Sequence, residues 1–187
     1  MTNKKQRIGS IDYRDLPVPL QHELERYQFG RRSFPNFLKT LANAPAMLEA
    51  YLAFGRALEK SSLPISIREK IALAVSELNS SEYDVAAHSQ KAASAKVSET
   101  EIELSRRANS NCSTDAALLN FAKNVVQKRG ILSDSELEEA RQYKWDDSLI
   151  IEVVATIACV HFANLINNLA NTVLDSPAVR EISHNQY

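Results

Sequence analysis

Glycine and proline are scarce in this chain, with 4 and 6 among 187 residues. An all-β domain needs many tight turns, and these two residues supply much of the backbone geometry that such turns require. Their scarcity therefore favours a helical protein. The length suits one domain with a full hydrophobic core, and 44% hydrophobic with 24% charged residues is the balance of a globular protein.

A marked excess of charge of either sign is also missing, because the formal net charge is −1. Proteins that bind nucleic acid or anionic membranes usually carry clustered positive charge, so we expect neither as a partner. The most apolar stretch, Leu149 to Val160, is shorter than a bilayer requires and contains Glu152. The basic start, Met1 to Arg7, is not followed by an apolar segment, which predicts no signal peptide and a cytoplasmic protein.

Cysteine is nearly absent, and its two copies, Cys112 and Cys159, form neither a CxxC motif nor a zinc-binding spacing. We interpret them as reduced thiols, at least one of which lies in the core. The four histidines also lack paired spacing: His22, His88, His161 and His184. We therefore expect neither a metal site nor a bound cofactor.

What the sequence does contain is helical periodicity with helix-start signals, and no strand-like alternation. Three Ser-x-x-Glu capping boxes predict helix starts at Ser66–Glu69, Ser98–Glu101 and Ser133–Glu136. Ser113-Thr114-Asp115 and Asp146-Asp147 predict two more, and the second of these begins a long helix that reaches about Leu174. That helix is apolar nearly all round at its start, which indicates burial or a contact between subunits.

The predicted fold class is therefore all-α, in a single domain overall. Residues 1–33 are expected to form an N-terminal arm and a first helix closed by Gly30. Residues 34–187 are expected to form the main helical domain, in which Ala44-Pro45 separates two helical stretches.

The most informative segment is Asn79-Ser-Ser-Glu-Tyr-Asp-Val-Ala-Ala-His88. It resembles the motif of AhpD-like proteins, Asn-Gly-Cys-x-Tyr-Cys-x-x-x-His, which has a glutamate twelve residues before the first cysteine. Glu69 stands twelve residues before Ser81, and His88 stands seven after it. Ser81 and Asp84 occupy the positions of the two cysteines.

Two further segments resemble the same family: Phe34-Pro35-Asn36, and the run from Phe162 to Asn168. On these residues the chain is identified as a member of the carboxymuconolactone decarboxylase / AhpD-like superfamily over roughly residues 34 to 175. The resemblance implies an AhpD-like helical fold with a central helical hairpin that carries the motif. It also implies an oxidoreductase of the alkylhydroperoxidase type, an antioxidant peroxiredoxin activity, or else a decarboxylase. Family members assemble into trimers or hexamers, so we expect a homo-oligomer.

The resemblance places the redox dithiol at two positions where this chain has no sulfur. Reduction of peroxide by that route needs thiols that cycle through sulfenate and disulfide, which neither Ser81 nor Asp84 can do. Glu69 and His88 remain as the candidate catalytic residues of the motif. Their distances from the turn correspond to helical arms of roughly 16 and 12 Å, so a hairpin brings them to similar heights. Contact between them would hold the imidazole in one tautomer and form an acid–base pair.

Several alternatives remain open at this point. Glu69 is also explained as a capping residue, His88 as a hydrogen-bonded histidine between helices, and Ser81 with Asp84 as a capping box. Tyr83 is a weak catalytic candidate and is better explained as a packing residue with a polar tip.

Three functions follow from these alternatives. The first is Glu69/His88 acid–base chemistry on a small organic acid, lactone or similar substrate, which fits a decarboxylase branch that also lacks the CxxC. The second is thiol-dependent hydroperoxide reduction through Cys112 or Cys159. The third is a non-catalytic oligomeric binding protein.

Overall fold

The computed structural model describes residues 5–25, 34–180 and 182. Within these residues the chain forms nine α-helices and one 3-10 helix and contains no strand, which confirms the predicted all-α class. The elements in chain order are η1 (Tyr13–Asp15), α1 (Val18–Glu25), α2 (Asn36–Leu41), α3 (Pro45–Glu59), α4 (Ile65–Leu78), α5 (Glu82–Ser94), α6 (Glu99–Arg106), α7 (Ser113–Gln127), α8 (Asp134–Gln142) and α9 (Asp147–Ala170).

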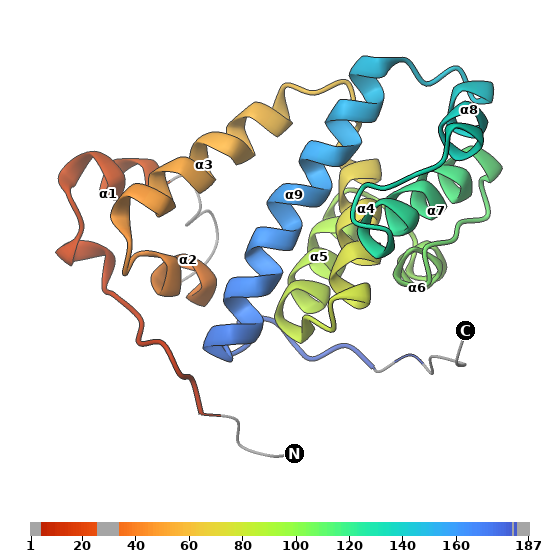
Figure 1. Cartoon of the computed structure of the whole chain (residues 1–187). Helices are drawn as coiled ribbons and strands as arrows, with labels where there is room; N and C mark the ends of the chain where they lie inside the picture. Colours follow the sequence, from red (N-terminus) through yellow and green to blue (C-terminus); the bar gives the residue numbers. More distant parts are fainter. Residues whose placement is uncertain (1–4, 26–33, 181, 183–187) are drawn as a thin grey trace.

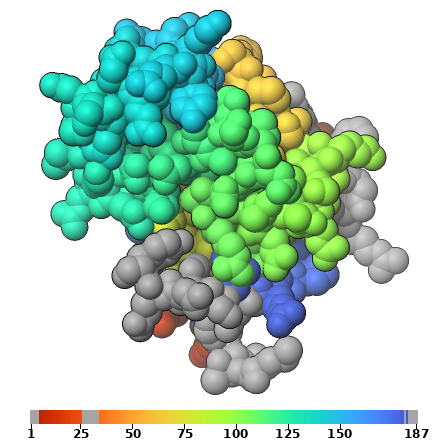
Figure 2. All heavy atoms as spheres, turned by 90° about the vertical axis from the view of Figure 1, so that its right-hand side faces the viewer, coloured from red at the N-terminus to blue at the C-terminus, as the bar shows by residue number. Residues whose placement is uncertain are grey.

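Helix α9 runs through the middle of the molecule (Figure 1). In that view α1, α2 and α3 lie on its left, and α4 to α8 lie on its right. It contacts α2, α3, α4, α5 and α7, while α4 packs against α5, α6, α7 and α9. Figure 2 shows the side of the molecule whose visible surface is formed largely by α6, α7 and α8. Helices α4 and α9 therefore form the frame on which the others are placed.

The buried apolar residues form two clusters, and α9 contributes to both. The first joins α4, α7 and the first half of α9, with Ile71, Leu119 and Val153 at its centre. The second joins the N-terminal helices to Ala163 of α9 and includes Leu48, which has no exposed surface. Burial of each leucine or isoleucine stabilises the fold by about 1.5–3 kcal/mol. Two cores on one helix fix the position of α9 from both sides.

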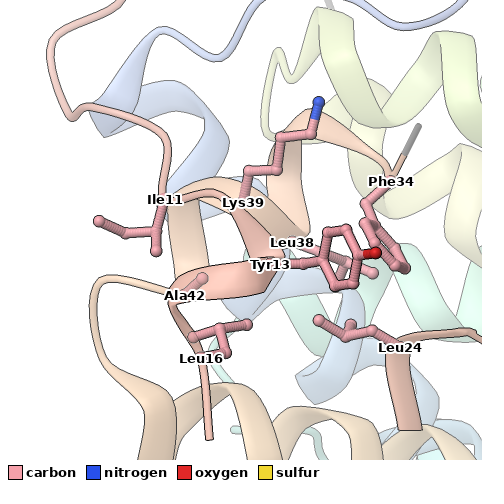
Figure 3. A pocket seen from close by; sticks show the side chains of 8 residues that line it. All are labelled: Ile11, Tyr13, Leu16, Leu24, Phe34, Leu38, Lys39 and Ala42. Carbon is pink, nitrogen blue, oxygen red and sulfur yellow. The ribbon is translucent and has the colours of Figure 1, made fainter. Parts of the chain in front are cut away.

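The segment predicted as an arm packs against α2. The rings of Tyr13 and Phe34 lie 4.8 Å apart, and the amide of Ile11 donates a hydrogen bond to the carbonyl of Lys39 at 3.0 Å. These side chains border a shallow apolar hollow with no room for a water molecule (Figure 3). Its walls are almost entirely hydrocarbon, so we interpret it as imperfect packing of this segment. Gly30 and His184 lie outside the described residues.

Three of the predicted helix starts have the expected side-chain bonds, in whole or in part. Ser133 and Glu136 form a complete capping box, and Asp146 caps α9 by accepting from the amide of Leu149. Ser98 accepts from the amide of Glu101, but the Glu101 carboxylate binds Lys70 rather than returning to the cap.

Two other predictions of helix ends were wrong. Helix α7 begins at Ser113 itself, after Cys112, and Asp115 binds Lys70 at 2.8 Å because that buried ammonium needs a second carboxylate. Helix α9 ends at Ala170 rather than near Leu174, because Asn171 adopts the left-handed conformation that closes many helices.

The apolar stretch of α9 was expected to be too short to cross a membrane, and the length of the helix corrects this expectation. Among the described residues, this one helix is long and apolar enough to cross a membrane, judged by length and composition alone. The core helix of a soluble protein meets the same criterion. In this structure one face of α9 packs against α2, α3, α4, α5 and α7, and 39% of the apolar window is buried.

Candidate functional site

The candidate site lies on the hairpin of α4 and α5, as the sequence predicted. A short turn joins the two helices, and Ser80 in this turn has a φ of 52°. The amide of Ser81 donates to the carbonyl of Ser76 at 2.9 Å and closes the end of α4. A left-handed residue with a side chain costs roughly 1–2 kcal/mol, which explains why the motif that this segment resembles has glycine here.

Glu69 of α4 and His88 of α5 are in direct contact. The Nδ1 atom of His88 lies 2.6 Å from Oε2 of Glu69, and the two side chains retain only 12% and 13% of their exposure. This contact was predicted from the hairpin geometry and is present. Because Glu69 uses its carboxylate here, it does not act as the capping residue of α4. The capping box at Ser66 was wrong, since α4 begins at Ile65 after Pro64 and has no side-chain cap.

The charge on Glu69 is favoured by its surroundings. Burial tends to raise the pKa of this carboxyl group, but the charge and hydrogen bond of His88 outweigh it, with help from Lys91 and Arg68. The pKa of Glu69 therefore lies below its ordinary value. At neutral pH the carboxylate is ionised and acts as a fixed acceptor for the ring N–H of His88.

The two residues at the cysteine positions form a different, fully buried arrangement. Ser81 has no exposed surface and Asp84 has 3%. The hydroxyl of Ser81 donates to Oδ2 of Asp84 at 2.6 Å, and Nδ2 of Asn167 in α9 donates to the same oxygen at 2.9 Å. Ser81 precedes α5 but makes no side-chain cap, so the capping-box interpretation was wrong. These residues link α5 to α9.

The hydroxyl of Tyr83 is likewise held by hydrogen bonds within the fold. Its hydroxyl accepts a hydrogen bond from the amide of Phe37 at 3.1 Å and donates to the carboxylate of Asp175. Burial, together with the hydrogen bond to Asp175, raises the pKa of Tyr83 above its ordinary value. Tyr83 thus joins α5 to α2 and to the segment after α9, and its hydroxyl proton is already donated to Asp175.

A cluster of asparagines lies between the end of α4 and α9, and its members were named from the sequence only as parts of the family resemblance, without the bonds between them. Nδ2 of Asn79 lies 2.9 Å from Nδ1 of His161 and donates to Oδ1 of Asn164 at 2.8 Å. Asn168 donates to the carbonyl of Asn79 at 2.8 Å. The signal was present in the sequence, because repeated asparagines on an otherwise apolar helix need partners inside the fold. His161 is thus within hydrogen-bonding distance of Asn79.

The two cysteines are both free and differ in environment. Cys112 is exposed at the start of α7, whereas Cys159 is buried in α9. Burial raises the pKa of Cys159 to about 11, although Lys91 and a hydrogen bond with Tyr51 act in the opposite direction. A thiol with that pKa is almost wholly protonated at neutral pH and is a poor nucleophile. In the part of the chain that the structure describes, no group of three or more His, Cys, Asp or Glu side chains is placed to hold a metal ion.

Residues 45–128, which include Glu69 to His88, match the model of the carboxymuconolactone decarboxylase family. None of the curated proteins compared with the chain matches it.

Solved structures share the fold over nearly the whole chain. A peroxidase-related protein from Ralstonia eutropha JMP134, described as an alkylhydroperoxidase AhpD core, is 21% identical with a TM-score of 0.84, over 93% of this chain and 94% of that one. A peroxidase-related protein from Silicibacter sp. TM1040 is 21% identical with a TM-score of 0.80, over 92% and 94%. The debrominase Bmp8 is 19% identical with a TM-score of 0.75, over 89% and 90%. At these identities the likeness concerns the fold, and it confirms the AhpD-like architecture.

Proposed function

Residues 45–128 match the model of the carboxymuconolactone decarboxylase family, and we propose that the chain belongs to this family, within the AhpD-like superfamily, and is an acid–base enzyme. Glu69 and His88 move protons on a small organic substrate such as an organic acid or a lactone. The observation that carries this proposal is the 2.6 Å contact between Nδ1 of His88 and Oε2 of Glu69.

The chemistry follows from the direction of that hydrogen bond. An ionised Glu69 accepts the proton on Nδ1, which leaves Nε2 of His88 as the nitrogen that exchanges a proton with a substrate. When Nε2 takes up a proton, the imidazolium is stabilised by the carboxylate beside it. When Nε2 returns the proton, the same pair acts as a general acid. The pair therefore supports proton abstraction and return without any redox step.

The residues at the cysteine positions support the same conclusion. Ser81 and Asp84 carry no sulfur, and both are enclosed by α9. Peroxide reduction through a dithiol at this place would need two thiols there. The activity suggested by the peroxidase-related structures is therefore not the one that this hairpin favours.

The substrate class is drawn from the family and from one of the structures that share the fold. A cysteine-to-alanine variant of the debrominase Bmp8 was solved in complex with 2,3,4-tribromopyrrole. That complex shows a small planar organic molecule bound to this fold. We therefore propose a substrate of similar size that carries an acidic C–H, or a leaving carboxylate, within reach of His88.

A substrate screen with two matched histidine variants tests the proposal. The purified protein is incubated with lactones and small organic acids, and separately with hydroperoxides plus a dithiol. We expect turnover in the first set, and we expect His88→Gln to lower kcat by about 10²- to 10⁴-fold. His161→Gln is the control, because it also removes a hydrogen-bonded histidine but leaves Glu69 and His88 in place.

Three outcomes would contradict the proposal. Unchanged turnover in His88→Gln would remove the acid–base role. Hydroperoxide consumption that is lost in Cys112→Ser or Cys159→Ser would favour the thiol-dependent alternative. Binding of a substrate analogue to the wild-type protein, with no turnover of any compound in the screen, would favour a binding protein that has kept the fold without the chemistry.

A further inference from the structure

A small cleft lies between α7 and α8, which are neighbours on the right of Figure 1. It has about 40 Å³ of space that water-sized atoms can occupy. A water molecule needs roughly 10–15 Å³ of such space, so a head group of a few heavy atoms fits the cleft. None of its lining residues belongs to the α4–α5 hairpin. The side chains that give the cleft its chemistry are Asn120, Phe121, Asn124, Glu139, Tyr143 and Trp145.

The cleft is open because α8 meets α7 through a small side chain. Ala140, which borders the cleft, is the one residue of α8 that is buried. A methyl group at this position fills less of the gap between two helices than a leucine side chain would. The α7 side of the remaining space is bordered by Asn120 and Asn124, which lie one turn apart on the same face of their helix.

Aromatic rings form one part of the lining. The rings of Tyr143 and Trp145 stack with their centroids 5.3 Å apart, and Phe121 meets Trp145 edge-on at 5.9 Å. Phe121 and Trp145 are buried, whereas Tyr143 keeps 41% of its exposure. The face of an aromatic ring is electron-rich and attracts a cation. The rings therefore favour a cationic ligand, and a planar one can also stack on them.

The polar side chains of the cleft add acceptors that have no partner in the fold. Among the residues that the structure describes, nothing bonds the side chains of Asn120, Asn124 or Glu139. Glu136 also borders the cleft, but its carboxylate already pairs with Lys128 at 2.6 Å. Glu139 thus supplies a negative charge that no described cation balances, and the two amides supply carbonyl oxygens beside it.

We propose that the α7–α8 cleft binds the guanidinium group of a small molecule. This group is planar, carries a positive charge and has up to five N–H donors but no acceptor. It matches the lining because it can stack on an aromatic ring while its edge donates to a carboxylate and to amide oxygens. A compact ammonium group cannot stack in this way, and a neutral group gains nothing from Glu139. The proposal is independent of the acid–base chemistry at Glu69 and His88.

A titration of the full chain with methylguanidinium chloride tests the proposal. Trp145 is the one tryptophan of the chain, so its fluorescence reports on the cleft directly. At constant ionic strength we expect a saturable change with a Kd of about 1 mM, which is within reach of a ligand this small. Glu139→Gln should weaken binding by about tenfold, because it removes the charged acceptor. The control is Glu138→Gln, an exposed neighbour on α8 that does not line the cleft.

Two further ligands separate the shape of the head group from its charge. Methylurea is planar but neutral, and methylammonium is charged but compact, so each should bind at least about tenfold more weakly. Calorimetry of Tyr143→Leu, which changes the surroundings of Trp145, should show a loss of about threefold.

Four results would overturn the proposal. The first is the absence of a saturable change with methylguanidinium, and the second is a Glu139→Gln protein that binds it as tightly as the Glu138→Gln control does. The others are equal binding of methylurea, which would show that the charge is not recognised, and equal binding of methylammonium, which would show that any cation suffices. Circular dichroism of each variant checks that its helix content is unchanged.

Discussion

Two pairs of polar side chains on the α4–α5 hairpin belong to the same sequence motif but differ in their surroundings. Ser81 and Asp84 are almost completely buried and share a third partner, Asn167 of α9. Glu69 and His88 keep slightly more than a tenth of their exposure and bond each other directly. The first pair is enclosed by another helix, whereas solvent reaches the second.

This difference indicates that the two halves of the motif now have separate roles. A buried carboxylate with two donors holds helices together, because each of those donors would otherwise be left unpaired inside the core. A partly exposed carboxylate and imidazole can exchange protons with a bound molecule. We expect changes to the first pair to alter stability, and changes to the second pair to alter activity.

The largest expected loss of stability comes from Asp84→Ala. The change leaves the hydroxyl of Ser81 and the amide of Asn167 buried without an acceptor, which should lower the free energy of unfolding by about 3 kcal/mol. Urea denaturation measures this loss. The control is Asp147→Ala on the surface, where the ion pair with Arg141 is exposed and the effect should stay within about 1 kcal/mol. Equal losses in the two variants would show that the buried bonds of Asp84 stabilise the fold no more than an exposed ion pair does.

A smaller effect, which depends on pH, is expected for Glu69→Gln. Near pH 7 the wild-type protein should be more stable than the variant by about 1–2 kcal/mol, because the ionised carboxylate bonds the ring N–H of His88. The pKa of Glu69 is lowered in the folded state, so this contribution is complete above the ordinary value of 4.5. It is lost as the pH falls through the lowered pKa, where the carboxyl group is protonated in both states.

Urea denaturation between pH 7 and pH 3 measures that difference. Glu103→Gln on the exposed side of α6 serves as the control and should match the wild type at each pH. A difference for Glu69→Gln that grows on acidification would contradict the sign of the shift.

The smallest perturbation is the labelling of the two cysteines. Cys112 should react readily with a thiol reagent at pH 8, since it is exposed. Cys159 should react at least about 100-fold more slowly, because it is buried and because a pKa of about 11 leaves on the order of 0.1% as thiolate. Thiol release followed by absorbance gives both rates, and urea should release the second thiol. Two fast thiols in the native protein would mean that Cys159 is accessible and would reopen the redox alternative.

Sequence reasoning predicted those features that depend on local spacing. The helical class, the capping box at Ser133, the cap at Asp146 and the contact of Glu69 with His88 all follow from residues that lie near one another on one helix or one hairpin. The hairpin is short enough that counting residues from its turn brings the two functional side chains to the same height.

The remaining features depend on contacts between distant segments. Whether Glu69 caps α4 or bonds His88 is decided by how α5 packs on α4, and both bonds were compatible with the sequence. Asn167 lies more than 80 residues from Ser81, so no local pattern indicates that it donates to Asp84. The same reason explains why the bonds between Asn79 and α9 were not predicted.

The central position of α9 has a consequence for how the protein is made. A ribosome synthesises α9 only after α2, α3, α4, α5 and α7, which pack against it. Until then the apolar sides of α4 and α3 that face α9 have no cover, and the nascent chain resembles the partly folded intermediates that aggregate readily. We therefore expect this protein to complete its folding only once α9 has been synthesised, and to depend on chaperones during the interval.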